Sequence, residues 1–299
     1  MSRLPSDHAE RMVRARLALD GLSVGDAFGG RFFSPPGESR AIPPPPWSYS
    51  DDTEMALEVV SMLDRRGEIE PDELASGFAR RYMADPFRGY GMTVRRVLEE
   101  IAEGIHWRDA AGRVFDGMGS MGNGGAMRVA PIGAYFADDY GVVVEQSRIS
   151  AATTHAHPEG QAGAIAVAVA SAWTSQAIDR ASAGLDGREM LVVVLEHTPD
   201  GETRAGIERA LSVDFARPVL SAVAVLGNGS RITAPDTVPF ALWCAARHVA
   251  NYAEALWAAA SAGGDNDTNA AIVGGVVAPA GGPGSIPPAW LSSRELLKP

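Results

Sequence analysis

One stretch of this chain limits the possible folds more than any other. Residues 163–172 are apolar on every side of a helical wheel, which predicts a helix that other elements surround completely. The longest apolar run, 163–173, is too short to span a bilayer, so we expect the surrounding elements to be protein. With 299 residues, of which 46% are hydrophobic, the chain can bury such a helix in a large core.

The spacing of apolar residues elsewhere is also helical. Ala56, Val59, Val60 and Leu63 follow the i, i+3, i+4, i+7 spacing of one helix face. Similar patterns predict helices near residues 8–20, 71–84, 91–104, 143–173, 202–213, 233–249 and 251–262. Alternating strand patterns are scarce, and residues 191–195, a candidate strand, fit a helix equally well. The sequence therefore predicts an all-α fold.

The chain shows no boundary between domains. No long Ser/Gly run, charge block or shift in composition divides it, so we expect one compact multi-helix domain over residues 1–299. The Pro-rich segment 34–47 cannot be regular helix, and residues 117–125 contain five glycines in nine positions. Residues 279–288 are rich in Pro and Gly, which predicts that 283–299 form a surface tail.

The net charge and the N-terminal residues argue against several classes of protein. The net charge of −11 and the lack of a basic stripe argue against nucleic acid and anionic lipid as partners. An anionic nucleotide would need local backbone N–H groups or bound cations to hold it. Residues 1–17 lack the apolar core of a signal peptide, so we expect a cytoplasmic protein with no membrane contact. Cys244 stands alone in an apolar run, which predicts a buried, inert thiol.

Two acidic segments, each just before a helical stretch, carry the strongest chemical signal. They are Tyr49-Ser50-Asp51-Asp52-Thr53-Glu54 and Gly263-Gly264-Asp265-Asn266-Asp267-Thr268. Either segment alone could be a helix cap, but a cap needs only one side-chain oxygen. Several hard oxygen donors in a row are typical of a site for Mg²⁺ or Mn²⁺. If the segments meet in the fold, two divalent ions would balance four crowded carboxylates.

Two further segments indicate a ligand site. The small residues of 118–128 would let backbone N–H groups face an anion, although the segment has neither a Rossmann nor a P-loop pattern. The segment Thr153-Thr154-His155-Ala156-His157-Pro158 has two histidines two positions apart. Zinc is one interpretation, but no Cys partner or Glu-x-x-His pattern supports it. Contact between one of these histidines and a ligand is the favoured interpretation.

Taken in order, these segments resemble the ADP-ribosylglycohydrolase family, which includes the dinitrogenase reductase-activating glycohydrolase of bacteria. The resemblance begins at Gly21-Leu22-Ser23-Val24-Gly25-Asp26-Ala27-Phe28-Gly29 and covers about residues 18–282. It continues through residues 50–55, 122–133, 153–158, 236–240 and 263–275. It implies a single all-α ADP-ribosylglycohydrolase-like domain that holds two Mg²⁺ or Mn²⁺ ions.

The resemblance also implies roles for individual residues. Metal would be bound from one side by Ser50, Asp51 and Asp52, and from the other by Asp265, Asp267 and Thr268. Asp52 and Asp267 would also take part in catalysis. The diphosphate and ribose would lie along Ser120, Met121, Gly122, Asn123 and Gly124, and His155 would contact ADP-ribose.

The implied reaction is hydrolysis of the glycosidic bond between ADP-ribose and an acceptor, with release of ADP-ribose. The substrate would be an ADP-ribosylated protein or small molecule, with arginine on a protein as the commonest acceptor in the family. Serine, a nucleic-acid end and a small molecule stay open as acceptors. A hydrolase for another glycosidic or phosphate substrate and a non-catalytic ADP-ribose-binding module are the alternative functions.

One departure from the family leaves the catalytic acid or base open. Many members carry a glutamate a few residues after the Gly-Asp-Ala-x-Gly turn, where this chain has Gly30-Arg31-Phe32-Phe33. Phe33 aligns best with that glutamate, and Glu38 is the nearest acid. Asp85, before Pro86 at the end of a predicted helix, is a candidate catalytic carboxylate. A simple turn residue before a proline is an equally good interpretation of Asp85.

Overall fold

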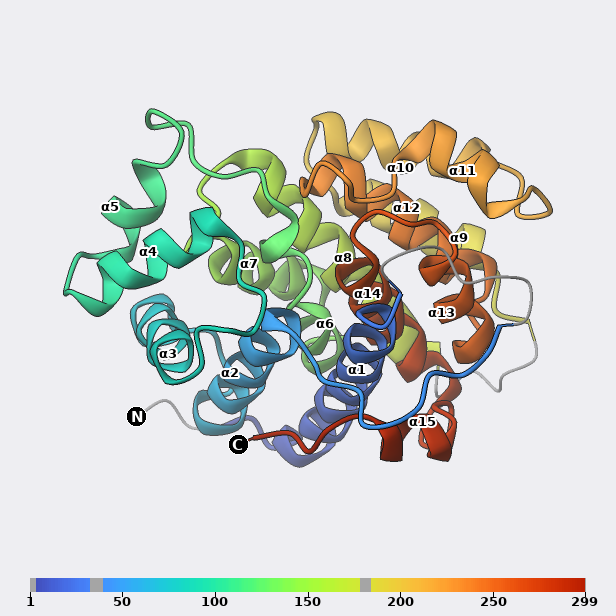
Figure 1. Ribbon diagram of the computed structural model, residues 1–299, viewed down its shortest axis with the longest axis horizontal. Coiled ribbons are helices and arrows are strands. Elements are labelled where there is room, and N and C mark those ends of the chain that lie inside the picture. The colour runs from blue at the N-terminus through green and yellow to red at the C-terminus, as the bar shows by residue number, and fades with distance from the viewer. Residues whose placement is uncertain (1–3, 33–39, 178–183, 299) are drawn as a thin grey trace.

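Two glycine-containing helices, α1 (His8–Gly29) and α14 (Asn266–Gly281), cross at the centre of the molecule (Figure 1). Gly21, Gly25 and Gly29 lie four residues apart on the face of α1 that meets α14. A β-carbon at any of these positions would lie 2.1–2.3 Å from a carbonyl oxygen of α14. Because only glycine allows two backbones to approach so closely, this spacing sets where the helices cross.

The computed structural model describes residues 4–32, 40–177 and 184–298, and every regular element in these ranges is helical. The other α-helices are α2 (Asp51–Arg66), α3 (Pro71–Ala84), α4 (Met92–Ala102), α5 (Trp107–Gly112), α6 (Ala130–Tyr135), α7 (Tyr140–Ala152), α8 (Pro158–Gln176), α9 (Gly187–His197), α10 (Glu202–Ser212), α11 (Val219–Leu226), α12 (Ala234–Arg247), α13 (Tyr252–Ala260) and α15 (Pro288–Ser293). A short 3₁₀ helix, η1 (Asn123–Gly125), ends the glycine-rich loop formed by residues 117–125. The predicted all-α fold is confirmed.

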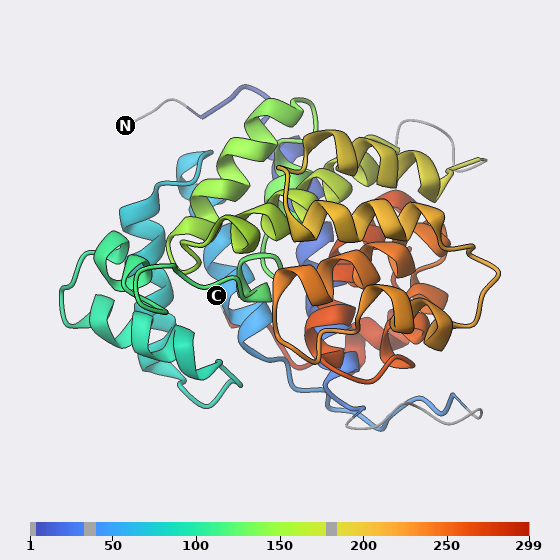
Figure 2. The same ribbon diagram turned by 90° about the horizontal axis from the view of Figure 1, so that it is seen from above.

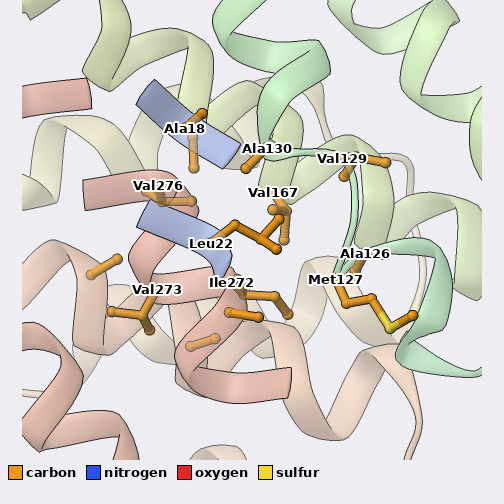
Figure 3. Close-up of a cluster of buried hydrophobic side chains, with 14 of the residues drawn as sticks. Ala18, Leu22, Ala126, Met127, Val129, Ala130, Val167, Ile272, Val273 and Val276 are labelled. Atoms are coloured by element: carbon orange, nitrogen blue, oxygen red, sulfur yellow. The ribbon is translucent and has the colours of Figure 1, made fainter. Parts of the chain in front are cut away.

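Helix α8 contains the apolar stretch 163–172 and is buried along nearly its whole length, as predicted. Helices α6, α7, α9, α12 and α14 pack around it. Figure 3 shows the core where Val167 of α8 lies near Leu22 of α1 and Ile272 of α14. In the described ranges, none of the helices combines the length and apolarity that a membrane crossing requires.

One hydrophobic cluster extends from Met12 in α1 to Trp290 in α15, so the helices share a single core. A small satellite cluster of Val97, Ala110 and Ala111 lies between α4 and α5. Figures 1 and 2 show α3, α4 and α5 together on one side of the molecule, with α9–α13 on the other. Residues from both sides line one cavity.

The predicted helix over 143–173 is wrong in one respect, because the structure divides it into α7 and α8. Pro158 is the first residue of α8, where its missing N–H costs no hydrogen bond. The residue before a proline avoids the helical conformation, so the chain must leave the helix before Pro158. Residues 191–195 belong to α9, so the helical interpretation of that run is correct.

The predicted surface tail over 283–299 is wrong in part, because this segment contains a helix that packs on the core. Pro279 lies inside α14, and α15 follows within a few residues. Trp290 of α15 is buried and stacks on Phe28 of α1, with 4.6 Å between ring centroids. The Pro and Gly content of this segment indicated a loop, but the aromatic cluster that holds Trp290 comes from distant parts of the chain.

Candidate metal centre and ligand cavity

The two acidic segments meet where α2 and α14 begin. Thr268 Oγ1 lies 3.5 Å from Oδ2 of Asp52, although the two residues are 216 positions apart in sequence. Carboxylate oxygens of Asp26, Asp52 and Asp267 lie within 4.8 Å of one another. The crossing of α1 and α14 therefore brings a third segment, the one containing Asp26, to the acidic cluster.

Asp26 is a member of this cluster that the sequence analysis did not identify as a site residue. Its buried carboxylate accepts hydrogen bonds from the backbone N–H of Ser50 at 2.9 Å, and from the N–H and hydroxyl of Thr53 at 3.1 and 2.5 Å. These bonds fix the turn that starts α2. The sequence pattern that could have indicated Asp26 is an acidic residue between the glycines of a buried helix. Carboxylates are rarely buried unless they have a binding partner.

Neutral groups hold the other carboxylates in place. Ser50 caps α2, since its Oγ accepts the N–H of Asp52 at 3.2 Å and donates to Oδ2 of Asp52 at 2.8 Å. The side-chain amide of Asn123 donates to Asp265 at 2.6 Å and to Thr237 Oγ1 at 3.0 Å. Asn123 thus connects the glycine-rich loop to the start of α14.

The electrostatics of the cluster favour a bound cation. Burial, followed by the charge of Asp267, raises the pKa of both Asp26 and Asp265 to about 7. Burial, followed by the charge of Asp26, raises the pKa of Asp51 and Asp52 well above the usual value for aspartate. These carboxylates therefore resist ionisation together unless positive charge is added.

An unsatisfied oxygen shows that the residues fit such a cation. Oδ1 of Asp52 is buried and has no hydrogen-bond partner among the described residues. A buried carboxylate oxygen left unpaired costs free energy, which a bound cation would offset. Carboxylates with the neighbouring hydroxyls of Ser50 and Thr268 are the hard oxygen donors that Mg²⁺ and Mn²⁺ prefer.

The cluster opens into a cavity of about 410 Å³. Its lining includes most of the residues to which the sequence analysis gave metal or ligand roles: Asp51, Asp52, Ser120, Met121, Gly122, Asn123, Gly124, His155, Asp265, Asp267 and Thr268. Ser50 is not in the lining but donates a hydrogen bond to Asp52, which is. The structure thus brings the acidic segments, the glycine-rich loop and the histidine segment to one place.

His155 packs directly against the glycine-rich loop. A β-carbon on Gly122 or on Gly124 would lie 3.1 Å from Nε2 of His155, so larger residues would displace the imidazole. Burial, with a further contribution from the charge of Arg128, lowers the pKa of His155 to about 3. The imidazole at this wall is therefore neutral at physiological pH.

The second histidine of this segment has a different place. Nδ1 of His157 accepts the N–H of Glu159 at 3.1 Å, so His157 caps α8. The group of side chains within the described ranges that could hold a metal consists of aspartates alone. The geometry therefore favours ligand contact over zinc binding for this histidine segment.

The structure does not bring Asp85 to the cavity. It lies at the end of α3, where its Oδ2 accepts Nε of Arg88 at 3.0 Å and pairs with Lys298 at 3.6 Å. It lines a separate hollow with Glu54 and Arg81. The position that matches the family glutamate, Phe33, and the nearby Glu38 lie outside the described residues.

The mouth of the cavity carries exposed apolar side chains that the sequence analysis missed. Met92, Phe115 and Ile232 all line the cavity and are 87%, 55% and 61% exposed. Phe115 and Ile232 have positive φ angles of 51° and 55°, which bulky side chains rarely adopt. Phe115 and Ile232 are single apolar residues in loops, and Met92 is the first residue of α4, so no periodic pattern in the sequence marks any of the three.

Comparisons with known proteins show which family this chain resembles. The sequence model of ADP-ribosylglycohydrolase matches residues 7–297. The chain is 31% identical to "ADP-ribosylhydrolase ARH3" of Gallus gallus over 284 residues, covering 84% of this chain and 75% of that protein. It is 32% identical to the Homo sapiens protein of the same name over 282 residues, covering 83% and 74%.

Two further relatives cover more of the chain. A protein of Archaeoglobus fulgidus is 31% identical over 302 residues, covering 95% of this chain and 93% of that protein. A solved structure described as "ADP-ribosylglycohydrolase-related protein complex" has a TM-score of 0.68 and 25% identity, covering 96% of this chain and 94% of that one. The family model and these relatives span nearly all the helices described above. The chain therefore belongs to the ADP-ribosylglycohydrolase family.

Proposed function

We propose that this chain hydrolyses the glycosidic bond between ADP-ribose and an acceptor, releases ADP-ribose, and uses two Mg²⁺ or Mn²⁺ ions. The observation that carries the proposal is the buried aspartate cluster at the wall of a cavity that also holds the glycine-rich loop. Membership of a family of hydrolases supports the reaction class. The relatives named ADP-ribosylhydrolase support ADP-ribose as the group that is bound.

The residues that would hold the ions come from two helix starts. Ser50, Asp51 and Asp52 would bind from α2, and Asp265, Asp267 and Thr268 from α14. Such ions, when bound, supply positive charge that orients the ribose hydroxyls and lowers the pKa of water toward neutrality. Asp26 would hold the α2 turn in position through its bonds to Ser50 and Thr53.

The glycine-rich loop and His155 would bind the diphosphate. The protein is acidic overall, so attraction to an anion must come from groups at the site itself. Gly122 and Gly124 leave the loop backbone accessible in the cavity, and the neutral imidazole of His155 packs against them and also lines the cavity. Holding the diphosphate here would fix the ribose beside Asp52 and Asp267 and lower the entropic barrier to cleavage.

The apolar mouth would bind the adenine base. Phe115, Ile232 and Met92 offer the flat and aliphatic contacts that a purine face requires, and they lie at the open end of the cavity. Strained backbone at Phe115 and Ile232 costs about 1–3 kcal/mol per residue and clusters at ligand clamps. Adenine at the mouth and ribose at the aspartates would place the two ends of ADP-ribose at opposite ends of the cavity.

The lining of the cavity bears on the acceptor. In the described part of the chain, its carboxylates are Asp51, Asp52, Asp265 and Asp267, all members of the acidic cluster. None is left to pair with the guanidinium of an arginine acceptor, whereas a serine acceptor is uncharged and needs no such partner. We therefore place a hydroxyl-linked acceptor such as serine ahead of arginine, which the sequence alone put first.

The test uses two peptides of the same sequence that carry ADP-ribose on serine or on arginine. Each is incubated with the protein and Mg²⁺, and free ADP-ribose is measured by chromatography. The proposal predicts release from the serine peptide at a rate about tenfold or more above the arginine peptide. Release from arginine alone would contradict the acceptor but not the reaction. Tight binding of ADP-ribose with no release from either peptide would favour the binding-module alternative.

A further inference from the structure

Arg128 is a completely buried cation directly after the glycine-rich loop. Its hydrogen bonds to oxygen all go to uncharged groups: the carbonyls of Gly124 and Ser150 at 3.2 and 2.6 Å, and the hydroxyls of Thr153 and Thr154 at 3.4 and 3.0 Å. The guanidinium also lies 4.4 Å from the ring centroid of Phe78. The charge of Asp51 favours the guanidinium, but no carboxylate accepts a hydrogen bond from it among these contacts. Burying a cation in this way is costly, which indicates a role beyond stability.

The contacts of Arg128 link the two segments that line the cavity wall. Through Gly124 it holds the glycine-rich loop, and through Thr154 it holds the segment between α7 and α8. Thr154 is 1% exposed, and its Oγ1 lies 2.8 Å from Nδ1 of His155. A chain of hydrogen bonds therefore runs from Arg128 through Thr154 to the histidine in the cavity.

The protons in this chain can be assigned by counting donors. A guanidinium only donates, so Oγ1 of Thr154 must accept from Arg128. The hydroxyl proton of Thr154 then needs an acceptor, because buried donors are almost always paired. Nδ1 of His155 is the neighbouring atom that can accept it, which requires an unprotonated Nδ1. In a neutral imidazole the ring proton is then on Nε2.

The proton on Nε2 would lie at the cavity wall. Nε2 of His155 lies against Gly122 and Gly124, and all three residues line the cavity. A protonated Nε2 offers a hydrogen-bond donor to an anionic ligand at this wall. The opposite tautomer would direct a lone pair toward the anion and leave the Thr154 hydroxyl proton without its acceptor.

We propose that Arg128 and Thr154 are positioning residues that fix His155 as an Nε2–H donor for an anionic group in the cavity. The identification of that group as the diphosphate of ADP-ribose rests on the proposed function. Arg128 does not need to touch the ligand in this arrangement. It acts through the acceptor role that it imposes on Thr154.

The first test reads the tautomer directly. Protein labelled with ¹⁵N at histidine is studied by long-range ¹H–¹⁵N correlation, in which protonated and unprotonated ring nitrogens give distinct signals. The His155 signals are identified by their loss in His155→Gln. We expect a protonated Nε2 and an unprotonated Nδ1 in the wild type, and a mixture of tautomers in Thr154→Val, which lacks the hydroxyl.

The second test measures ADP-ribose binding by calorimetry in the same proteins. Thr154→Val should weaken binding about tenfold, the value of one hydrogen bond, and Thr154→Ser should restore it to within about twofold. Thr153→Val is the matched control, because Thr153 also contacts Arg128 but has no bond to His155. It should bind ADP-ribose like the wild type. A purely structural role for Thr154 would not change the tautomer signal.

The outcomes separate this inference from the proposed function. An unprotonated Nε2 in the wild type would overturn the inference, even if the protein releases ADP-ribose. Wild-type affinity and an unchanged His155 spectrum in Thr154→Val would overturn it as well. If Thr154→Val does not fold, the wild-type spectrum and Thr154→Ser still decide the matter. A protonated Nε2 in a protein that does not bind ADP-ribose would support the tautomer assignment and contradict the proposed function.

Discussion

Several buried polar groups in the site lack the partners that usually accompany them. Oδ1 of Asp52 has no hydrogen-bond donor within the described residues, and the guanidinium of Arg128 is bonded to neutral oxygens. A cation at the first and the orientation of His155 at the second would account for these costs. A cation bound at Asp52 would therefore stabilise the folded protein.

Ile232 provides a test of the apolar mouth at the residue scale. Asparagine adopts positive φ more readily than a β-branched residue, so Ile232→Asn should raise the free energy of unfolding by about 1 kcal/mol. The same change removes an apolar contact with adenine and should weaken ADP-ribose binding about fivefold. Urea unfolding and calorimetry measure the two effects.

Ribose 5-phosphate is the control ligand for this variant because it has no base. Its affinity should be the same for Ile232→Asn and the wild type. An equal loss of affinity for both ligands would place Ile232 away from the adenine and contradict the proposed orientation of ADP-ribose.

The crossing of α1 and α14 positions the site at the scale of elements. A methyl group at Gly25 would lie 2.1 Å from the carbonyl oxygen of Ala270, so Gly25→Ala must separate the two helices. We expect a loss of about 3 kcal/mol in the free energy of unfolding and weaker Mn²⁺ binding, because Asp26 moves away from Asp267. Gly112→Ala is the control, since open space surrounds Gly112 at the end of α5. Wild-type stability in Gly25→Ala would contradict this account of the crossing.

Glu295, near the C-terminus, holds the turn that leads into α2 through hydrogen bonds and an ion pair. The carboxylate of Glu295 accepts the N–H of Tyr49 at 2.9 Å and pairs with Arg88, whose Nη1 also donates to the carbonyl of Tyr49 at 3.0 Å. Glu295→Ala would leave Arg88, which is mostly buried, without this partner. We expect a loss of about 2 kcal/mol in the free energy of unfolding and a lower affinity for Mn²⁺.

Leu296→Ala is the neighbouring control for Glu295→Ala, because the side chain of Leu296 is 89% exposed. Urea unfolding and metal titration of both variants separate the loss of the Glu295 contacts from a general effect of the C-terminus. If Glu295→Ala binds Mn²⁺ as tightly as Leu296→Ala does, the segment stabilises the fold without positioning the site.

At the scale of the whole molecule, the aspartate cluster makes metal-free stability depend on pH. The pKa of Asp26 and of Asp265 is raised to about 7 in the folded protein, whereas an unfolded chain has aspartate near about 4. The folded protein therefore holds protons that the unfolded chain releases. This contribution to stability is complete below about pH 4 and is lost as the pH rises through about 7.

Thermal unfolding of chelator-treated protein should show this dependence. The Tm should fall between about pH 5 and pH 8, and saturating Mg²⁺ should remove most of the fall because the ions bind the ionised carboxylates. A Tm that rises over this range without metal would mean that the folded protein does not raise the pKa of these carboxyl groups.

The sequence predicted those features that local patterns determine. Helical spacing predicted α3, α10 and α13 to within a few residues. Hard donors at two helix starts indicated Asp52 and Asp267, and the structure brings these two residues into one acidic cluster. The sequence failed where distant segments decide the structure. Trp290 is buried by an aromatic cluster, and Asp26 reaches the site through the crossing of two helices. A proline that begins a helix also divided one predicted helix into two.

Metal-dependent release of ADP-ribose tests the central claim most directly. Chelator-treated wild-type protein, Asp52→Ala and Asp267→Ala are each given ADP-ribosyl-serine peptide, and Mg²⁺ or Mn²⁺ is titrated back while free ADP-ribose is measured. Our account predicts release by the wild type only when metal is present, and a loss of about a thousandfold or more in both variants at saturating metal. Near-normal release by the two variants, or undiminished release by the chelated wild type, would contradict it.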